Sequence, residues 1–599
     1  MVNALVLFLC MSNKEIAKLL ENVATAYTIK NEKKFRFQII AYLKASETIA
    51  ELNGELSEYY KEEKLDQLPG IGPTIQSHLI ELFKKKKVKH FTWVLKGIPK
   101  SIFVLTDIPS FGPKKAFKLV SFFKLNNPKT VIDELEKVAK RGKIANLEGF
   151  GEKSQQDILR AIAEFREGKG KTTRMVLPYA FEIAQKVMDY LKQEKTIERV
   201  EALGSLRRRV STIGDIDFAV ATKNPKKVIE HFTNYPYKER IIEKGEVSAS
   251  ILISGGRQID LLIQPLESFG SLLQHFTGSK NHNVHLREYA LKKGLSLSEY
   301  GIKNLKSKSK SLQKYSSEED FYKALSLQWI TPELREDQGE IETAVKNKLP
   351  KLVELTDIKG DFHIHSNFPI EPSHDLGKDS MEEMLEKARQ LNYEYLGFSE
   401  HNPSTSKHTS KEIYDLLKKR DEKIEQFKSV NKYVRIFKLL EVDILPSGDL
   451  AIDNKSLELL DAAIISIHSV FTMGKDEMTQ RVLKGLSHKK AKILAHPTGR
   501  LLNDRYGYDL DFEKVFEFCK KHNKALEINS WPQRLDLPDT IIKQAVENNV
   551  NLVIDSDSHA VSQMELQKYG VFMARRGWAT KNDILNTMSY NEIIDWFND

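Results

Sequence analysis

The sequence has little cysteine and no long apolar run, and both shortages limit what the protein can be. Only two of its 599 residues are cysteines, Cys10 and Cys519. We therefore expect no disulfide framework, and we expect the protein to occupy a reducing compartment. The opening MVNALVLFLC is apolar, but it is far shorter than the ~20 residues of a membrane span and lacks the basic flank of a secretory signal. We therefore expect a cytoplasmic protein without a membrane anchor, and interpret residues 1–12 as a leader or an over-called start.

The chain is too long for one hydrophobic core, and its character changes several times along its length. An excess of 92 Lys and Arg over 83 Asp and Glu gives a net charge of +9, which is compatible with nucleic acid but does not require it. Helical patterns come first, β-rich runs follow, and from Asp361 short apolar strands alternate with helices, as in a parallel β/α barrel. The predicted divisions are a leader at 1–12, helical regions at 13–95 and 96–174, a mixed helix and strand domain at 175–265, a mixed subdomain at 266–337, a linker at 338–355 and the barrel at 356–599.

A short glycine turn followed by a helix occurs three times in the N-terminal third. The copies are LDQLPGIGPTIQSHLIELF, LTDIPSFGPKKAFKLVSFF and IANLEGFGEKSQQDILRAI. Glycine lets the backbone turn tightly, and the N–H groups of the turn and of the following helix can hold a phosphate oxygen without reading a base. The copies resemble helix-hairpin-helix motifs of DNA repair proteins, although Ser110 replaces the first glycine of the second copy. The resemblance implies DNA contacts at Gly70, Gly72, Gly112, Gly149 and Gly151.

The strongest motif is a pair of acids in the segment ALGSLRRRVSTIGDIDFAV. Asp215 and Asp217 are two residues apart on a predicted strand, so both carboxylates lie on one face. Such a pair repels itself unless cations intervene, and hard oxygen ligands suit Mg²⁺. A third acid, Asp260, lies in the apolar run QIDLLI, which could pair beside the first strand. An unpaired acid is costly in such a run, which favours a functional role for Asp260. A structural alternative, with Asp-x-Asp closing a turn and the arginines solvated, stays open.

The segment GSLRRRVSTIGDIDF resembles the signature of family X DNA polymerases, the relatives of DNA polymerase beta. The resemblance implies that Asp215, Asp217 and Asp260 bind catalytic Mg²⁺ or Mn²⁺ for two-metal nucleotidyl transfer. HFTGSKNHNVHLREYALKKGLSLSEYGI resembles the nucleotide-selection segment of that family, but His275 replaces its usual tyrosine, which leaves sugar selectivity open. The implied nucleotide-binding residues are Gly204, Ser205, Arg208, Gly214, Phe276, Gly278, Ser279, Asn283 and Arg287.

Histidine is sparse, with sixteen residues in the chain, yet it recurs at predicted strand ends of the C-terminal part. His363 and His365 alternate on one strand face, and Asp557 and His559 repeat that spacing. Strand ends of a β/α barrel converge on one mouth, so these side chains can meet. Mixed imidazole and carboxylate ligands suit Zn²⁺, Mn²⁺ or Fe²⁺ better than Mg²⁺ alone. One such histidine would more often be a core residue, and it is the recurrence that indicates a metal site.

The pieces DFHIHS, SEH, LEVDI, ISIHS, AHPTGR and DSDSH resemble the PHP domain (polymerase and histidinol phosphatase), a distorted barrel that binds three metal ions. Asp375 is the candidate for an acidic ligand that follows the first motif, and Arg500 is expected to contact substrate phosphate. The resemblance implies 3′–5′ exonuclease activity and makes abasic-site cleavage or 3′-phosphate removal plausible. The implied metal ligands are His363, His365, Asp375, His401, Glu441, His468, His496, Asp557 and His559.

Together the resemblances cover nearly the whole chain from about residue 13. They predict a multidomain α/β protein with a helix-hairpin-helix N-terminal region, a nucleotidyltransferase palm with a mixed β-sheet and a C-terminal distorted (β/α)7 PHP barrel. The expected function is short-gap filling in base excision repair by a monomeric, template-dependent DNA polymerase that takes dNTPs and gapped or primer–template DNA and also processes 3′ ends. The alternatives are a polymerase with a structural PHP domain, a non-catalytic DNA-end-binding protein and a small-molecule phosphatase.

Overall fold

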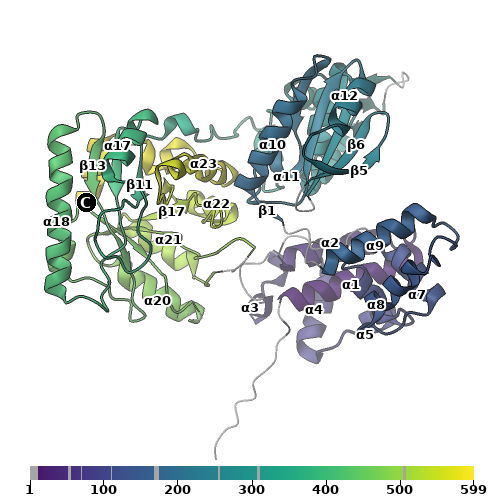
Figure 1. Ribbon diagram of the computed structural model, residues 1–599, viewed down its shortest axis with the longest axis horizontal. Coiled ribbons are helices and arrows are strands. Elements are labelled where there is room, and N and C mark those ends of the chain that lie inside the picture. Colours follow the sequence, from purple (N-terminus) through teal and green to yellow (C-terminus); the bar gives the residue numbers. More distant parts are fainter. Residues whose placement is uncertain are drawn as a thin grey trace, which may run out of the picture. The chain divides into compact units, whose positions relative to one another are not determined.

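The computed structural model (Figure 1) divides into two compact units, Met1–Thr172 and Thr173–Asp599. It describes residues 11, 13–50, 56–61, 63–68, 71–108, 111–166, 174–253, 257–306, 311–471, 473–503 and 507–599. The predicted leader, Gly70 and Ser110 lie outside the described residues, apart from Met11. Among the described residues, no helix combines the length and the apolar character that crossing a membrane requires.

The first unit is helical throughout its described part and contains two apolar cores. One core runs from Ile16 to Val94 and the other from Ile102 to Ile162. Gly72 and Gly112 each precede a helix whose first residue is proline, which suits that position because its missing N–H would have no helical partner. The helices are α1 (Asn13–Asn31), α2 (Arg36–Ala50), α3 (Leu56–Lys61), α4 (Pro73–Lys85), α5 (Lys89–Leu95), α6 (Lys100–Leu105), α7 (Pro113–Phe123), α8 (Val131–Lys140) and α9 (Glu152–Arg166).

The second unit begins with a mixed five-stranded sheet in the order β2-β4-β7-β6-β5. Strands β4 and β7 are parallel neighbours, and the other pairs of this sheet are antiparallel. Inward-facing residues such as Phe218 and Ile259 are fully buried. The elements are β1 (Met175–Val176), α10 (Leu177–Leu191), β2 (Ile197–Ala202), α11 (Gly204–Arg207), β3 (Thr212–Ile213), β4 (Ile216–Thr222), α12 (Pro225–Thr233), β5 (Lys238–Lys244), β6 (Ser248–Ile253) and β7 (Arg257–Gln264).

A smaller subdomain follows this sheet and packs around its own apolar core, which includes Leu286 and Phe321. Its short antiparallel sheet has the order β10-β9-β8. Gly278 has a φ of +70°, where an L side chain would be strained, and it ends the first helix of the subdomain. The elements are α13 (Phe269–Thr277), α14 (Lys280–Lys292), β8 (Leu295–Ser298), β9 (Gly301–Asn304), β10 (Leu312–Gln313), α15 (Glu318–Ala324) and α16 (Glu340–Val345).

The C-terminal domain consists of parallel strands with helices around them (Figure 1). A three-stranded sheet β11-β12-β13 and a five-stranded sheet β14-β15-β16-β17-β18 are joined by parallel bridges, Ile364 to Ser558 and His401 to Glu441. The elements are β11 (Gly360–Ile364), α17 (Met381–Gln390), β12 (Tyr395–Phe398), α18 (Ser410–Val430), β13 (Arg435–Lys438), β14 (Glu441–Asp443), α19 (Asn454–Leu457), β15 (Ala463–Ser466), α20 (Lys475–Leu486), β16 (Ala491–Leu494), α21 (Phe512–Lys521), β17 (Ala525–Asn529), α22 (Asp539–Glu547), β18 (Asn551–Asp555), α23 (Gln567–Arg576) and α24 (Tyr590–Asn598).

The five-stranded sheet domain and the C-terminal domain contact each other through aromatic side chains. The ring of Phe181, on α10, lies 6.2 Å from Tyr569 and 6.0 Å from Phe572, both on α23. The Arg209 guanidinium lies over the rings of Phe181 and Phe572, at 4.8 and 4.5 Å from their centroids. The second unit is therefore held together by packing as well as by the chain.

Candidate active sites

The mixed sheet brings three acids together. In the parallel pairing of β4 with β7, Asp217 is the direct partner of Asp260, and Asp215 comes immediately before β4. One carboxylate oxygen from each of the three lies within 4.8 Å of the others. The expectation that Asp260 lies on a neighbouring strand is confirmed. Such a set of oxygen ligands fits divalent cations of the Mg²⁺ type.

Asp217 is the member of this group whose ionised form a cation would stabilise. Burial, together with Asp215 and Asp260, raises its pKa to about 7. A methyl group at Gly204 would lie 2.8 Å from Asp217 Oδ2, and the φ of Gly204 is +58°. Glycine is therefore required where α11 begins, both for its backbone conformation and for room beside the carboxylate.

Arg208 lies against the turn at Gly278, although 69 residues separate it from Thr277 in the sequence. Its Nη1 donates to the Thr277 carbonyl at 2.5 Å, and a Cβ at Gly278 would lie 3.2 Å from the same nitrogen. Its Nε donates to Glu336 at 2.9 Å. The structure thus brings together two of the predicted nucleotide-binding residues. Ser205 lies in α11, on the same short helix as Gly204.

The remaining predicted nucleotide-binding residues differ in how far their side chains are already engaged. Asn283 donates to the His275 carbonyl at 2.6 Å and accepts from Gln274 at 2.8 Å. Arg287 Nη2 lies 3.3 Å from His275 Nδ1. Phe276 is 38% exposed. Gly214 precedes Asp215, and Ser279 caps α14 by accepting from the His282 N–H.

The C-terminal domain contains a larger cluster, with Glu441 at its centre. Glu441 Oε2 lies 3.1 Å from His363 Nε2, 2.9 Å from His401 Nδ1 and 3.5 Å from His365 Nε2. Glu441 Oε1 lies 3.1 Å from His496 and 3.5 Å from His468. Burial alone would raise the pKa of Glu441, but His401, His363 and His468 hold it well below its ordinary value. One carboxylate therefore faces five imidazoles, as a bridging ligand does.

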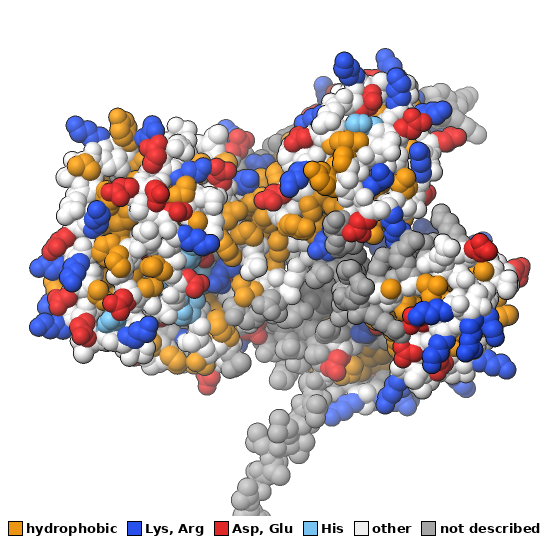
Figure 2. All heavy atoms as spheres, viewed as in Figure 1, with side chains coloured by type: hydrophobic (Ala, Val, Ile, Leu, Met, Phe, Trp, Pro, Cys, Tyr) orange, Lys and Arg blue, Asp and Glu red, His pale blue; other side chains and the backbone are white. Residues whose placement is uncertain are grey.

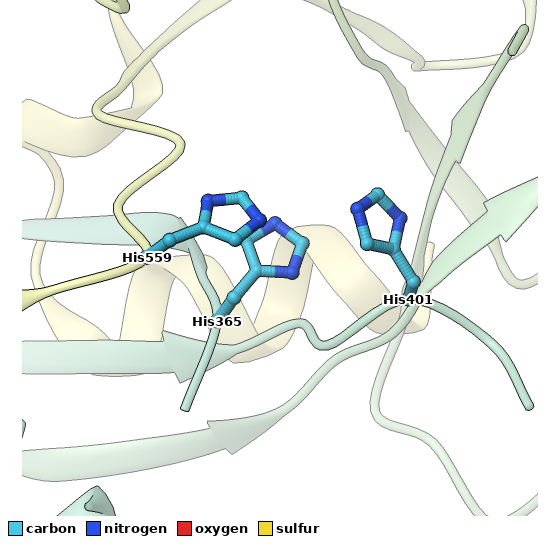
Figure 3. Close-up of side chains that lie close together, drawn as sticks. All are labelled: His365, His401 and His559. Atoms are coloured by element: carbon cyan, nitrogen blue, oxygen red, sulfur yellow. The ribbon is translucent and has the colours of Figure 1, made fainter. Parts of the chain in front are cut away.

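The rest of the cluster closes around these groups. His365 Nε2 lies 3.3 Å from Asp557 Oδ1, and the rings of His365 and His559 are stacked at 4.0 Å (Figure 3). Figure 3 also shows His401 facing this pair. Both nitrogens of His365 and Nε2 of His559 are buried without a hydrogen-bond partner in the described part of the chain. Buried polar atoms normally have a partner, so these atoms fit metal ligation.

The expected acidic ligand Asp375 is in none of the groups of possible metal ligands found among the described residues. Its neighbour His374 is in one of them, with Nε2 3.2 Å from Asp443 and its ring 4.3 Å from that of His468. His374, Asp443 and His468 form one of the groups that could hold a metal ion. The preference for a carboxylate over its neighbouring imidazole concealed His374, because spacing alone does not say which way a loop residue points.

Glu527 was also missed from the sequence. It is completely buried in β17; Oε1 lies 2.6 Å from His363 Nδ1, and Oε2 accepts from the His496 N–H at 2.6 Å. A carboxylate on the far nitrogen of a ligand histidine fixes the orientation of the ring and raises its basicity. An acid in the apolar run KALEINS is costly unless it is paired, and that argument would have found it.

Arg500 does not reach the cluster. Its guanidinium donates to the carbonyls of Arg534 and Leu535. Arg534 lies nearer, with Nε 3.8 Å from Asp557 Oδ2 and 17% of its side chain exposed. The guanidinium beside Asp557 is therefore that of Arg534, and Arg500 binds the backbone carbonyls of Arg534 and Leu535 instead.

In the helical unit, the described glycines of the repeat leave room beside the following helices. Outside their chain neighbours, no atom of the described residues lies within 4 Å of a Cβ placed at Gly72, Gly112 or Gly151. No side chain caps α4 or α7. Gly149 has a φ of +78°. Helix N-termini of this kind present unpaired N–H groups to a phosphate.

Known protein families match three regions of the chain separately, and one known protein matches almost its whole length. Family models match residues 11–88 as a helix-hairpin-helix domain, 272–336 as a DNA polymerase beta thumb and 361–531 as a PHP domain. The DNA polymerase/3′-5′ exonuclease PolX of Bacillus subtilis (strain 168) is 32% identical over 585 residues, which cover 97% of this chain and 99% of that protein. The chain belongs to the PolX family.

Two more distant relatives match smaller shares of this PolX chain. DNA polymerase lambda of Rattus norvegicus is 21% identical over 352 residues, 54% of this chain and 56% of that protein. A probable phosphatase of Photobacterium profundum is 31% identical over 100 residues, 16% of this chain and 38% of that protein. The PolX assignment agrees with the predicted family and fold class, whereas the domain boundaries and the residue roles remain predictions.

Proposed function

We propose that the chain is a template-dependent DNA polymerase that fills short gaps during DNA repair and a 3′-5′ exonuclease that acts through its C-terminal domain. The observation that carries the proposal is the presence of two separate ligand clusters, Asp215/Asp217/Asp260 in the sheet and the set around Glu441 in the barrel. The membership of the chain in the PolX family supports both activities. We propose gapped or primer–template DNA and dNTPs as its substrates and a monomer as its working form.

At the polymerase site, Asp215, Asp217 and Asp260 would hold Mg²⁺ or Mn²⁺. Ions bound there would lower the pKa of the primer 3′-hydroxyl and neutralise the leaving pyrophosphate. The chain's own contribution is to fix three carboxylates on adjacent strands and to keep Gly204 clear of Asp217. Arg208, held at Gly278, would grip the triphosphate with a guanidinium group.

At the C-terminal site, the histidines around Glu441 together with Asp557 would hold Mn²⁺, Zn²⁺ or Fe²⁺, and we propose three ions. Ions bound there would supply hydroxide near neutral pH and stabilise the phosphoryl transition state. Glu527 orients His363, and His374 replaces Asp375 as the ligand from the loop after β11. Arg534 would bind the phosphate of the 3′-terminal nucleotide, because its guanidinium is partly exposed beside Asp557.

DNA would be held by the helical unit. Figure 2 shows Lys and Arg side chains gathered over this unit, which suits a phosphate backbone. The described turns at Gly72, Gly112, Gly149 and Gly151 would donate backbone N–H groups to phosphates, and Gly70 is proposed from the sequence alone. Binding of this kind reads no base.

A single experiment tests both activities. A 5′-labelled primer on gapped DNA would be incubated with Mg²⁺ or Mn²⁺, with and without dNTPs. Asp215→Ala/Asp217→Ala should abolish extension and retain shortening, and His363→Ala/His365→Ala should do the reverse. Loss of both activities in either variant would contradict two independent sites. A wild-type protein that retards the primer on a gel without changing it would be a DNA-end-binding protein instead.

Removal of 3′-phosphates is a second candidate activity. The observation that favours it is the similarity to a probable phosphatase over 100 residues. A primer ending in a 3′-phosphate should then become extendable by the wild type, and should stay blocked with His363→Ala/His365→Ala. Abasic-site cleavage remains a prediction from the family resemblance.

A further inference from the structure

A chain of charged groups connects Arg208 to the C-terminal domain. Glu336 Oε1 accepts from Arg208 Nε at 2.9 Å and from Arg576 Nη1, also at 2.9 Å. Arg576 Nη1 donates in addition to the Arg208 carbonyl at 2.7 Å. Its Nη2 donates to Asp539, the first residue of α22. Two arginines and two acids thus alternate between the polymerase site and α22 of the C-terminal domain.

The position of these groups makes the contact specific. Arg576 ends α23, its side chain is 6% exposed, and 240 residues separate it from Glu336. Glu336 is the last residue matched by the polymerase beta thumb model. One oxygen of Glu336 is therefore shared between an arginine of the polymerase region and an arginine of the C-terminal domain.

The guanidinium of Arg208 is oriented by these partners. Nε is fixed by Glu336 and Nη1 by the Thr277 carbonyl, whereas Nη2 donates to none of the described residues. Two fixed nitrogens determine the plane of a guanidinium, and the third is left to receive a ligand. Arg576 holds both the carboxylate that fixes Nε and the carbonyl of Arg208 itself.

We propose that Arg576 is a positioning residue for the polymerase site: acting through Glu336, it sets the orientation of Arg208 for the triphosphate. This inference rests on the proposed function, in which Arg208 contacts the incoming nucleotide. Without Arg576, Glu336 has Arg208 as its only described cation, so the carboxylate competes more strongly with the triphosphate for that guanidinium. The C-terminal domain therefore contributes to nucleotide affinity without touching the nucleotide.

The neighbouring Arg575 provides a matched control. It also joins α23 to the segment that follows the smaller subdomain's helix α15, with Nε 2.9 Å from Glu333 Oε1 and Nη1 3.1 Å from the Val353 carbonyl. Neither of these contacts involves Glu336 or Arg208. Arg575→Met therefore removes a comparable inter-domain ion pair while leaving the orientation of Arg208 intact.

The experiment measures single-nucleotide insertion by the full chain on gapped DNA. Arg576→Met should raise the KM for dNTP about tenfold and change kcat less than about twofold, whereas Arg575→Met should change neither by more than about twofold. Arg576→Lys, which keeps the charge but cannot bridge Glu336 and Asp539 with one fork, should be intermediate. In a Glu336→Gln background, adding Arg576→Met should raise KM less than about twofold further.

The outcomes separate the inference from the function on which it rests. Equal KM values for Arg576→Met and Arg575→Met, or full additivity of Arg576→Met with Glu336→Gln, would overturn the inference while extension by the wild type stands. If Arg576→Met lowers kcat, Tm and 3′-end shortening together, the role of Arg576 is merely structural. Absence of extension by the wild type would instead refute the proposed function.

Discussion

Replacing Glu527 by glutamine tests whether the barrel cluster is a metal centre. Glu527 is buried, and both of its oxygens are engaged. Oε1 lies 2.6 Å from His363 Nδ1, and Oε2 accepts from the His496 N–H, also at 2.6 Å. Glutamine keeps the shape but supplies one oxygen and one NH₂ group, so one of these two donors must face another donor. His363 then loses either its orientation or the negative charge that raises its basicity.

The expected magnitude follows from metal sites of this type. Loss of the carboxylate behind a ligand histidine weakens metal binding about 10- to 100-fold, which corresponds to about 1.4–2.7 kcal/mol. Metal content would be measured by mass spectrometry after dialysis against buffers of set free Mn²⁺ or Zn²⁺, and 3′-end shortening would be followed against metal concentration. Polymerase activity should be unchanged, because Glu527 lies in the barrel.

Glu340→Gln is the matched control. Glu340 is also buried and also lies 2.6 Å from a histidine nitrogen, Nδ1 of His282, but in the smaller subdomain. Its replacement should leave metal binding at the barrel unchanged. Equal metal affinity of Glu527→Gln and wild type would refute the reasoning that the cluster around Glu441 binds ions through His363.

Three further predictions follow from the geometry. Gly204→Ala should lower primer extension about 100-fold and spare 3′-end shortening in the same gel assay, because its methyl would lie 2.8 Å from Asp217 Oδ2. The pKa of Asp217 lies at about 7, above that of an unfolded Asp. Ionisation of Asp217 therefore lowers the stability of the folded protein as the pH rises through 7, and bound Mg²⁺ offsets this loss. Below pH 7, bound protons compete with the cation, and the Mg²⁺ concentration for half-maximal extension should rise about tenfold per pH unit, measured between pH 6 and 8. His374→Ala should remove about one metal ion per chain by elemental analysis, whereas Asp375→Ala should leave the content unchanged; the reverse result would restore Asp375 as the ligand.

The carboxylate cluster of the sheet was predictable because strands impose a period of two. The two-residue spacing of Asp215 and Asp217 predicts one shared face, and the carboxylates do lie together although Asp215 comes just before β4. An acid in the apolar run around Asp260 needs a partner nearby. The alternating β/α pattern likewise indicated a barrel whose strand ends meet, which is where His363 and His401 lie. In each case the sequence spacing corresponds directly to a direction in space.

Other parts of the sites depend on contacts that no local period describes. The loop after β11 decides whether His374 or Asp375 faces the cluster, and loop backbones have no repeating direction. Arg534 lies beside Asp557, and Arg500 holds the backbone carbonyl of Arg534. Glu336 meets Arg576 across 240 residues. Such pairings appear only when the chain is folded.

The aromatic contact between α10 and α23 also has a consequence for dissecting the chain. Phe181 and Arg209 belong to the polymerase half, yet they pack on Tyr569 and Phe572 near the C-terminus. A fragment that ends before the barrel would expose this apolar surface to water and invite aggregation. Point substitutions can therefore remove one activity of this chain and keep the other, in evolution and in the laboratory. Deletion of the C-terminal domain, by contrast, would destabilise the polymerase region that packs on it.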